Sequence, residues 1–193
     1  MGNPPFVGYK LQTKQQKEEL NNIFEKVKIS DYVSGWYAKA SEIMSRNTDI
    51  TTAFVSTNSI TQGEQVAAIW GTLTKEYQIH INFAYRTFIW DSEATEKAHV
   101  HCVIIGFSVG SNSNEKMLVE GDSVNYVSNI NFYLVPADNI FITKTSKPLC
   151  GQPAMIYGSE PREGGNLILS SEEREALIHE SPFTEKIIKR FVS

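Results

Sequence analysis

The stretch Ile50-Thr-Thr-Ala-Phe-Val-Ser-Thr-Asn58, followed closely by Thr61-Gln-Gly-Glu64, decides the fold class that we predict for this chain. Its first part is rich in β-branched and aromatic residues, which favour a strand. Thr61 and Glu64 have the spacing of a capping box, in which two side chains satisfy free amides at the start of a helix. The stretch therefore predicts a strand that ends where a helix begins.

Helical patterns lie on both sides of this strand. After it, one apolar stripe at helical spacing comprises Val66, Ile69, Trp70, Leu73 and Tyr77. Before it, Asp31 is the predicted cap of a helix whose apolar face comprises Val33, Trp36, Tyr37, Ala40, Ile43 and Met44. Residues 11–27 add a loop and a surface helix. Helix, strand and helix with short connections are typical of an α/β sheet.

Two further strands are predicted at Ile79 to Trp90 and at Val100 to Phe107. The polar segment between them, residues 91–97, is too short for the crossover that parallel strands need, so the pair should form an antiparallel hairpin. Together with residues 50–58, the hairpin gives an incomplete sheet of about three strands.

A polar break near Ser108 to Asn114 marks the predicted end of a first domain, residues 1–108. Residues 109–193 should form a mixed extension, with strand-like pieces at Lys116 to Glu120, Tyr126 to Leu134 and Asn139 to Thr143. The extension also holds a loop from Gly158 to Gly165, a second capping box of Ser170 with Glu173, and a last helix announced by Ser181-Pro182.

The composition is that of a globular protein: 41% of the 193 residues are hydrophobic and 21% are charged. No apolar run approaches the ~20 residues of a membrane span and no leader peptide is evident, so we expect a cytoplasmic protein. Cys102 and Cys150 lack the density of a disulfide scaffold and the spacing of a zinc site, which predicts ordinary thiols. The net charge of -4 does not indicate a nucleic-acid binder, so a DNA partner would find most of its phosphate contacts elsewhere.

The motif that carries chemistry is Asn3-Pro-Pro-Phe6. Two prolines after an asparagine fix a rigid turn, in which side-chain and backbone carbonyl oxygens can converge on one small group. An exocyclic amine is such a group, because two acceptors on its protons turn its lone pair toward a methyl donor while an aromatic ring stacks on the base. Asn3, Pro4 and Phe6 supply these parts and Pro5 completes the turn, although the motif by itself also occurs in ordinary turns.

Further segments resemble, in order and over nearly the whole chain, the amino-group DNA methyltransferases of single-chain restriction-modification enzymes, which act on adenine N6. They are Asn3-Pro-Pro-Phe-Val-Gly8, Asp31-Tyr-Val-Ser-Gly-Trp-Tyr-Ala-Lys-Ala40, Ala53-Phe-Val-Ser-Thr-Asn-Ser-Ile-Thr-Gln-Gly-Glu-Gln65, Asn82-Phe-Ala-Tyr-Arg-Thr-Phe-Ile-Trp90 and Val100-His-Cys-Val-Ile-Ile-Gly-Phe107. Residues 147–169 resemble the passage from the catalytic domain to the target-recognition region, of which only the start is expected here.

The resemblance implies a partial class I methyltransferase sheet, which is Rossmann-like, with S-adenosylmethionine as cofactor and DNA as partner. The Asn3–Phe6 turn should lie at the carboxyl end of the fourth strand of that sheet, where open α/β sheets bind ligands. An aromatic side chain of the hairpin should stack on the flipped base, with Trp90 as first choice and Phe88 as second. Asn3 and Phe6 would only border the cofactor, because the glycine-rich turn and the acidic residue that hold it should precede Asn3.

Several alternatives stay open at this stage. Arg86 could reach a phosphate near the flipped nucleotide or pair with a surface carboxylate. His99 and His101 have a spacing compatible with a metal, but no third ligand is evident, so no metal is expected. The motif would also serve transfer to cytosine N4 or to a protein glutamine, and a non-catalytic DNA-binding or specificity module could retain it. A bare edge on the strand at residues 50–58 would favour a homo-oligomer.

Overall fold

The computed structural model of the protein describes residues 1–24, 30–90, 100–110, 113–145, 147–148, 150–153 and 164–190. The chain divides into two compact units, Met1–Lys144 and Thr145–Ser193, and each is described by itself. None of the helices in the described residues combines the length and apolar character that a membrane span requires.

The helices of the first unit follow the predicted order. They are α1 (Lys14–Ile23), α2 (Ser34–Arg46), α3 (Gly63–Gln65) and α4 (Gly71–Tyr77), with a π-helical turn at Val66–Trp70 between the last two. Short 3-10 turns occupy Tyr9–Leu11 and Asn58–Thr61. The surface helix near the start, the helix after Asp31 and the helical stripe that begins at Val66 are therefore confirmed.

The predicted cap of α2 is wrong. Val33 precedes the first helical residue, and the Asp31 carboxylate accepts hydrogen bonds from the hydroxyls of Thr57 and Ser59 instead. Only the Asp31 backbone carbonyl serves the helix start, by accepting from the Ser34 amide at 3.0 Å. The Asp31 carboxylate therefore bonds the last residue of the first strand and a residue of the 3-10 turn that follows that strand, whereas sequence spacing had predicted that it caps the helix.

The capping box of Thr61 with Glu64 is also wrong. The Thr61 hydroxyl donates to the Asn58 carbonyl at 2.8 Å, inside the 3-10 turn, and Gln62 precedes α3 without a side-chain bond to it. The Glu64 carboxylate instead forms an exposed ion pair with Lys144, at 3.5 Å. The strand and the helix are joined by an extra turn, which moves the helix start past the predicted cap.

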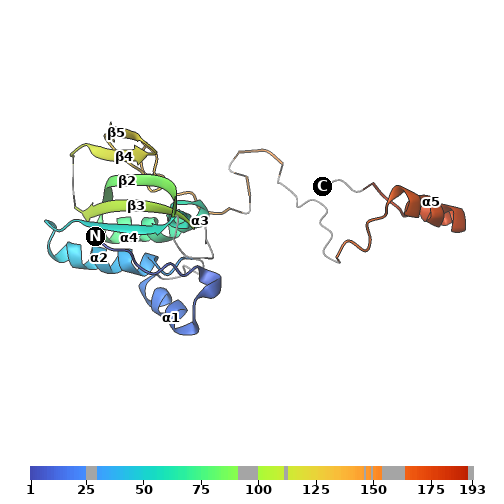
Figure 1. Ribbon diagram of the computed structural model, residues 1–193, viewed down its shortest axis with the longest axis horizontal. Helices are drawn as coiled ribbons and strands as arrows, with labels where there is room; N and C mark the ends of the chain where they lie inside the picture. The colour runs from blue at the N-terminus through green and yellow to red at the C-terminus, as the bar shows by residue number, and fades with distance from the viewer. Residues whose placement is uncertain are drawn as a thin grey trace. The chain divides into compact units, whose positions relative to one another are not determined.

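A five-stranded mixed sheet forms the centre of the first unit, in the order β1-β3-β2-β4-β5 (Figure 1). The strands are β1 (Thr52–Thr57), β2 (Ile79–Trp90), β3 (Val100–Val109), β4 (Lys116–Glu120) and β5 (Ser123–Val127). β3 pairs antiparallel with β1 and β2, β4 lies parallel to β2, and β5 is antiparallel to β4. The α/β class and the hairpin are confirmed, and β4 and β5 extend the sheet beyond the three predicted strands.

β1 forms one edge of the sheet, and the start of the chain lies against it. The Gly2 amide donates to the Ala53 carbonyl at 3.0 Å, and the Val55 amide donates to the Gly2 carbonyl at 3.1 Å. This isolated bridge is parallel, so the chain leaves Gly2 in the same direction as β1 leaves Phe54. The strand at residues 50–58 therefore lies beside the segment that leads into the Asn3–Phe6 turn, and Gly2 occupies part of the edge that was predicted to be bare.

The main core lies between the sheet and the helices α2 and α4, which share one face of it (Figure 1). Tyr37 of α2 and Trp70 of the π-helical turn are fully buried there, with ring centroids 4.9 Å apart in an edge-to-face arrangement. The Tyr37 hydroxyl hydrogen-bonds the Ser56 hydroxyl at 2.7 Å, and burial raises the pKa of Tyr37. The Trp70 indole N–H donates to the Ile60 carbonyl at 2.7 Å, so both polar groups are satisfied inside the core.

The predicted helical stripes account for most of this core. The buried members are Val33, Tyr37, Ala40, Met44, Val66, Ile69, Trp70 and Leu73. Tyr77 and Trp36 are half-buried. Ile43 departs from the prediction, because its side chain is 58% exposed on the outer face of α2.

The opposite face of the sheet carries no helix from the described residues of the first unit. On that face the Phe83 ring lies directly against Gly106, so that a Cβ atom at position 106 would come within 2.1 Å of the ring. Phe83 and Gly106 are register partners across β2 and β3, after a shift in register between Ile81 and Phe83. The glycine therefore provides the space that the aromatic ring needs.

Three strands were predicted after the polar break: one of them is confirmed, and the bounds or existence of the other two are wrong. β4 has the predicted bounds, but β5 ends at Val127, and residues 139–143 form no strand. Between them the Asn131 side-chain carbonyl accepts from the amides of Tyr133 and Val135, which bends the chain into turns instead of a strand. Three apolar residues of this segment still join the core: Ile130, Phe132 and Leu134.

The polar break near Ser108 to Asn114 does not divide the described structure. β4 and β5 continue the sheet, and the first compact unit extends to Lys144. The resemblance assigns residues 1–108 to the carboxy-terminal half of a catalytic domain and residues 109–193 to a linker and the start of a target-recognition region, and this assignment stays a prediction.

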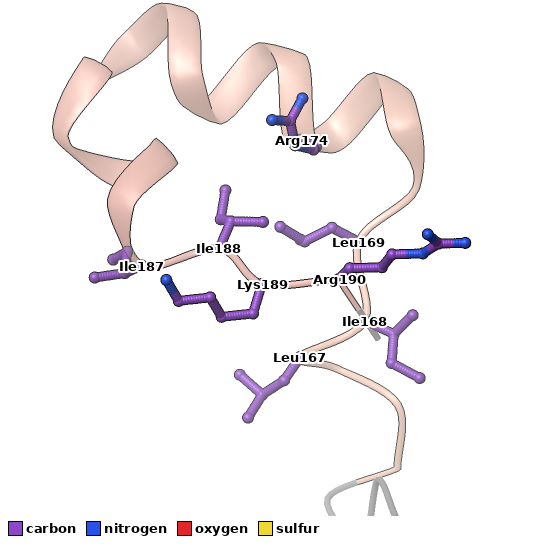
Figure 2. A pocket seen from close by; sticks show the side chains of 8 residues that line it. All are labelled: Leu167, Ile168, Leu169, Arg174, Ile187, Ile188, Lys189 and Arg190. Carbon is purple, nitrogen blue, oxygen red and sulfur yellow. The ribbon is translucent and has the colours of Figure 1, made fainter. Parts of the chain in front are cut away.

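The second unit contains α5 (Ser171–Glu180) and a 3-10 helix at Pro182–Lys186. The capping box of Ser170 with Glu173 is confirmed, with both reciprocal bonds present. A hollow of about 700 Å³ lies between these elements and the chain before α5 (Figure 2). Apolar and cationic side chains line it together: Leu167, Ile168, Leu169, Arg174, Ile187, Ile188, Lys189 and Arg190. Most of the predicted loop at residues 158–165 lies outside the described residues.

Candidate functional site

The residues of the predicted Asn3–Phe6 turn form neither a hydrogen-bonded turn nor a bend in the structure, and the name is kept for this segment. It follows directly from the bridge between Gly2 and β1. Because that bridge is parallel, the turn runs toward the carboxyl end of β1. The Asn3 side chain is exposed, Pro4 is buried and Phe6 is half-buried. The two prolines restrict the backbone while the Asn3 amide stays accessible, which is what recognition of an external amine requires.

The chain after the turn is fixed by a second set of bonds. The Val7 carbonyl accepts from the Tyr32 amide at 3.0 Å and from the Gln12 side-chain amide at 3.1 Å. The same Gln12 nitrogen donates to the Ser30 carbonyl at 2.9 Å. The turn is therefore anchored to the sheet before Asn3 and to the start of α2 after Phe6.

Asp31 ties the start of α2 to the end of β1. Its nearly buried carboxylate accepts the Thr57 hydroxyl at 2.7 Å and also the Ser59 hydroxyl. Its backbone amide donates to the Gln65 side chain at 3.2 Å. Hydrogen bonds to a carboxylate are the stronger kind, so this cluster gives the carboxyl end of β1 a defined geometry. Sequence spacing pointed to Asp31 but assigned it the wrong partner.

The two aromatic candidates of the hairpin come to the same end of the sheet. Phe88 pairs with Cys102, and Cys102 pairs with Thr57 at the end of β1. Trp90 pairs with Val100 further along, and its ring centroid lies 6.4 Å from that of Phe88. Trp90 is 43% exposed and Phe88 is half-buried, so Trp90 is the more accessible stacking surface.

Arg86 is paired within the structure. Its guanidinium lies 2.9 Å from the Glu120 carboxylate of β4, and both side chains are exposed. This is the surface ion pair that the sequence left open as the alternative to a phosphate contact. Such pairs contribute at most about 1 kcal/mol, so DNA could displace Glu120 at low cost. Phosphate binding by Arg86 stays a prediction.

The two histidines singled out by their spacing differ in what the structure describes. His101 is exposed on β3, and His99 lies outside the described residues. Within the described ranges, no group of three His, Cys, Asp or Glu side chains is placed to hold a metal ion. Both cysteines are free thiols, Cys102 buried and Cys150 exposed.

Sequence reasoning missed an apolar groove of about 420 Å³ between α1 and α2. Tyr32 and Trp36 line it as an edge-to-face pair with centroids 5.1 Å apart. The Tyr32 hydroxyl donates to the Glu19 carboxylate at 2.5 Å, and this bond raises the pKa of Tyr32. The i, i+4 spacing of the two aromatic residues was the available signal, but Trp36 was assigned to the core and Tyr32 was given no role.

Comparisons with known proteins place the chain among DNA methyltransferases. Residues 1–120 match the family model of the MmeI DNA-methyltransferase domain, and residues 136–193 match that of the MmeI target recognition domain. The chain therefore belongs to the MmeI family of DNA methyltransferases.

Two relatives illustrate the match. DNA methyltransferase A of Bacillus subtilis (strain 168) is 38% identical over 194 residues, covering 99% of this chain and 22% of the relative. A solved structure, the Type IIL restriction-modification enzyme MmeI in complex with DNA, is 42% identical with a TM-score of 0.83. It matches 100% of this chain, which spans 27% of that protein. The resemblance to single-chain restriction-modification methyltransferases is thus confirmed.

Proposed function

We propose that this chain supplies the catalytic turn of a methyltransferase that acts on the exocyclic N6 amine of adenine in DNA. The observation that carries the proposal is the position of the Asn3–Phe6 turn. It follows a parallel bridge to β1, with Asn3 exposed and the next residues anchored to α2. The sheet order around β1, β3 and β2 supports a class I, Rossmann-like assignment.

In the proposed reaction the Asn3 side-chain oxygen and the Pro4 carbonyl accept the two protons of the amine. These bonds hold the nitrogen lone pair toward the methyl group and strengthen as the nitrogen gains positive charge. Phe6 packs on the base beside them. The chain thus orients the nucleophile, and it relies on desolvation and geometry for the rate increase.

S-adenosylmethionine supplies an electrophilic methyl group when bound. The residues of this chain fit only part of such a cofactor: Asn3 and Phe6 can border it, but their turn offers no carboxylate for a ribose. We therefore propose that its main contacts come from residues other than these.

The 193-residue chain by itself should accordingly bind S-adenosylmethionine no better than millimolar, roughly -4 kcal/mol on the affinity scale. The reason is that a cofactor of this kind needs a glycine turn for close approach and a carboxylate for its ribose hydroxyls, and the Asn3–Phe6 turn, which is the part of the site that we propose, contains neither residue type. Isothermal calorimetry measures this directly. Micromolar binding would contradict the prediction and locate the cofactor site within these residues.

Trp90→Ala should weaken capture of the flipped base by about 1–3 kcal/mol, the usual contribution of one stacked aromatic side chain. Fluorescence of 2-aminopurine at the target position reports base flipping. The full-length protein for this and the other activity measurements carries this chain within a methyltransferase of the length of the relatives, of which the chain spans 22% and 27%. Ile89→Ala is the matched control, because Ile89 is also exposed on β2 but its side chain points to the other face. If base flipping were weakened by Phe88→Ala and unchanged by Trp90→Ala, the stacking role would belong to Phe88.

Cytosine N4 and protein glutamine amides present the same NH2 group to such a turn. The paired aromatic side chains at Phe88 and Trp90 favour a base over an amide side chain. Nucleoside analysis of methylated DNA distinguishes the adenine product from the cytosine product. A non-catalytic DNA-binding module would instead give salt-dependent DNA binding by the full-length protein without any methylated product.

We also propose DNA as the partner, a cytoplasmic location, and self-association through the part of the β1 edge that Gly2 does not bond. The relative solved in complex with DNA and the match to a target recognition domain support the first of these. The cationic residues of the second unit are suited to phosphates: Arg174, Lys189 and Arg190.

A further inference from the structure

Gln12 is a buried polar side chain within an otherwise exposed segment. Its exposed fraction is 6%, whereas the preceding Leu11 is 82% exposed and the following Thr13 is exposed. Burial of an amide costs free energy unless hydrogen bonds replace its water, so its position needs a reason beyond packing.

The reason lies in the two bonds of the Gln12 side-chain amide. It donates to the Val7 carbonyl at 3.1 Å and to the Ser30 carbonyl at 2.9 Å. Both acceptors are carbonyl oxygens, so only the NH2 end of the side chain can face them. The other end, Oε1, is buried without a hydrogen-bond partner among the described residues, so the two bonds of the NH2 group alone offset the cost of burial. One side chain therefore joins the residue after Phe6 to the segment that begins α2.

The Val7 carbonyl receives a second donor, the Tyr32 amide at 3.0 Å. The same carbonyl is thus held from two directions, by a side chain of its own segment and by the backbone next to Asp31. On the other side of the turn, Gly2 is bonded to β1 in both directions. The four residues Asn3–Phe6 span the short distance between these two anchored points.

We propose that Gln12 is a positioning residue for the Asn3–Phe6 turn, a role that rests on the function proposed above for that turn. By holding the Val7 carbonyl, Gln12 fixes where Phe6 and the Pro4 carbonyl stand relative to Asn3. An error of about 1 Å in such an arrangement can cost roughly 100-fold in rate, although no contact with substrate is lost. Gln12 therefore acts on turnover and not on DNA affinity.

The first test is Gln12→Met in the full-length protein, because methionine keeps the length of the side chain and removes both donors. We expect kcat for DNA methylation to fall about 10- to 100-fold with KM for DNA unchanged. Gln15→Met is the matched control: Gln15 lies on the exposed surface of α1 and bonds only Glu19, at 3.1 Å, among the described residues.

Gln12→Glu adds a readout that a purely structural role would not give. An ionised carboxylate has no donor and faces two carbonyl oxygens, which disfavours its charge and raises its pKa. On protonation it regains one O–H donor. The ratio of the kcat of this variant to that of the unsubstituted protein should therefore rise as the pH falls.

A third measurement needs no activity. In the 193-residue chain, Gln12→Met should speed hydrogen exchange of the Tyr32 amide about 2- to 10-fold. The reason is that the Val7 carbonyl, which accepts from this amide, is then no longer held in place by Gln12. The exchange rate of buried sheet amides such as Ile105 should not change.

Equal kcat values for Gln12→Met and Gln15→Met would overturn the proposal. A loss of kcat matched by equal losses of DNA affinity and thermal stability would also overturn it, because it would show a structural role. Failure of the proposed function has a different signature: Asn3→Ala would then retain activity. If Asn3→Ala is inactive while Gln12→Met is fully active, only the positioning role fails.

Discussion

Asn3→Ala in the full-length protein should lower methyl transfer to DNA by at least about 100- to 1000-fold while DNA affinity stays nearly unchanged. The Asn3 oxygen is the acceptor that turns the amine lone pair toward the methyl group, and this bond gains strength only as the nitrogen becomes charged. Single-turnover transfer of a radiolabelled methyl group gives the rate, and fluorescence anisotropy gives the DNA affinity.

The fold should tolerate this change, because Asn3 is exposed and surface substitutions usually alter stability by less than about 0.5 kcal/mol. Asn21→Ala provides the control, as it removes an exposed asparagine from α1. A variant that loses DNA affinity in parallel with activity would assign Asn3 to binding and contradict the proposed orientation of the amine.

Trp70→Ala should destabilise the first unit by about 3–5 kcal/mol, the usual cost of deleting a large buried aromatic side chain. Trp70 is fully buried, donates to the Ile60 carbonyl and stacks on Phe132 with centroids 5.0 Å apart. Removal of the indole therefore eliminates the packing of the π-helical turn at Val66–Trp70 against Phe132, which lies in the segment after β5. The midpoint of urea unfolding, followed by circular dichroism, measures the loss.

Trp36→Ala is the comparison for this experiment, because Trp36 is half-buried and packs mainly on Tyr32. We expect Trp36→Ala to lower the free energy of unfolding clearly less than Trp70→Ala does. Similar losses for the two variants would mean that the core does not depend on the Trp70 position as described.

The periodic features of the sequence predicted the fold well. The helical stripe from Val66 to Leu73 is buried, and the hairpin at residues 79–107 has the predicted pairing. These patterns predict structure well because an element that buries one face needs an apolar residue at every helical turn, or at every second strand position, and this spacing is visible in the sequence. The Asn3–Phe6 motif could be recognised for a different reason, because it is a contiguous run of residues that needs no long-range partner to be read. Its predicted turn is not formed, and its catalytic role stays a prediction.

Long-range hydrogen bonds account for what the sequence could not predict. Asp31 bonds Thr57 and Ser59, which are 26 and 28 residues away, and spacing rules for a local cap cannot anticipate this. Gln12 is similar, since its bond to Ser30 spans 18 residues and nothing in the local pattern marks it as buried. A single sequence shows which residues can form such hydrogen bonds, but it does not show which partners lie next to them in the folded protein.

The contact of Phe83 with Gly106 also bears on how the hairpin assembles. A slip of one residue between β2 and β3 would place the Phe83 ring opposite Ile105 or Phe107, where side chains already fill the space. It would also turn Phe88 and Trp90 to the other side of the sheet. A hairpin misaligned by one residue would therefore contain a steric collision at Phe83. The absence of a side chain at position 106 thus favours the alignment that keeps both aromatic rings on their present face of the sheet.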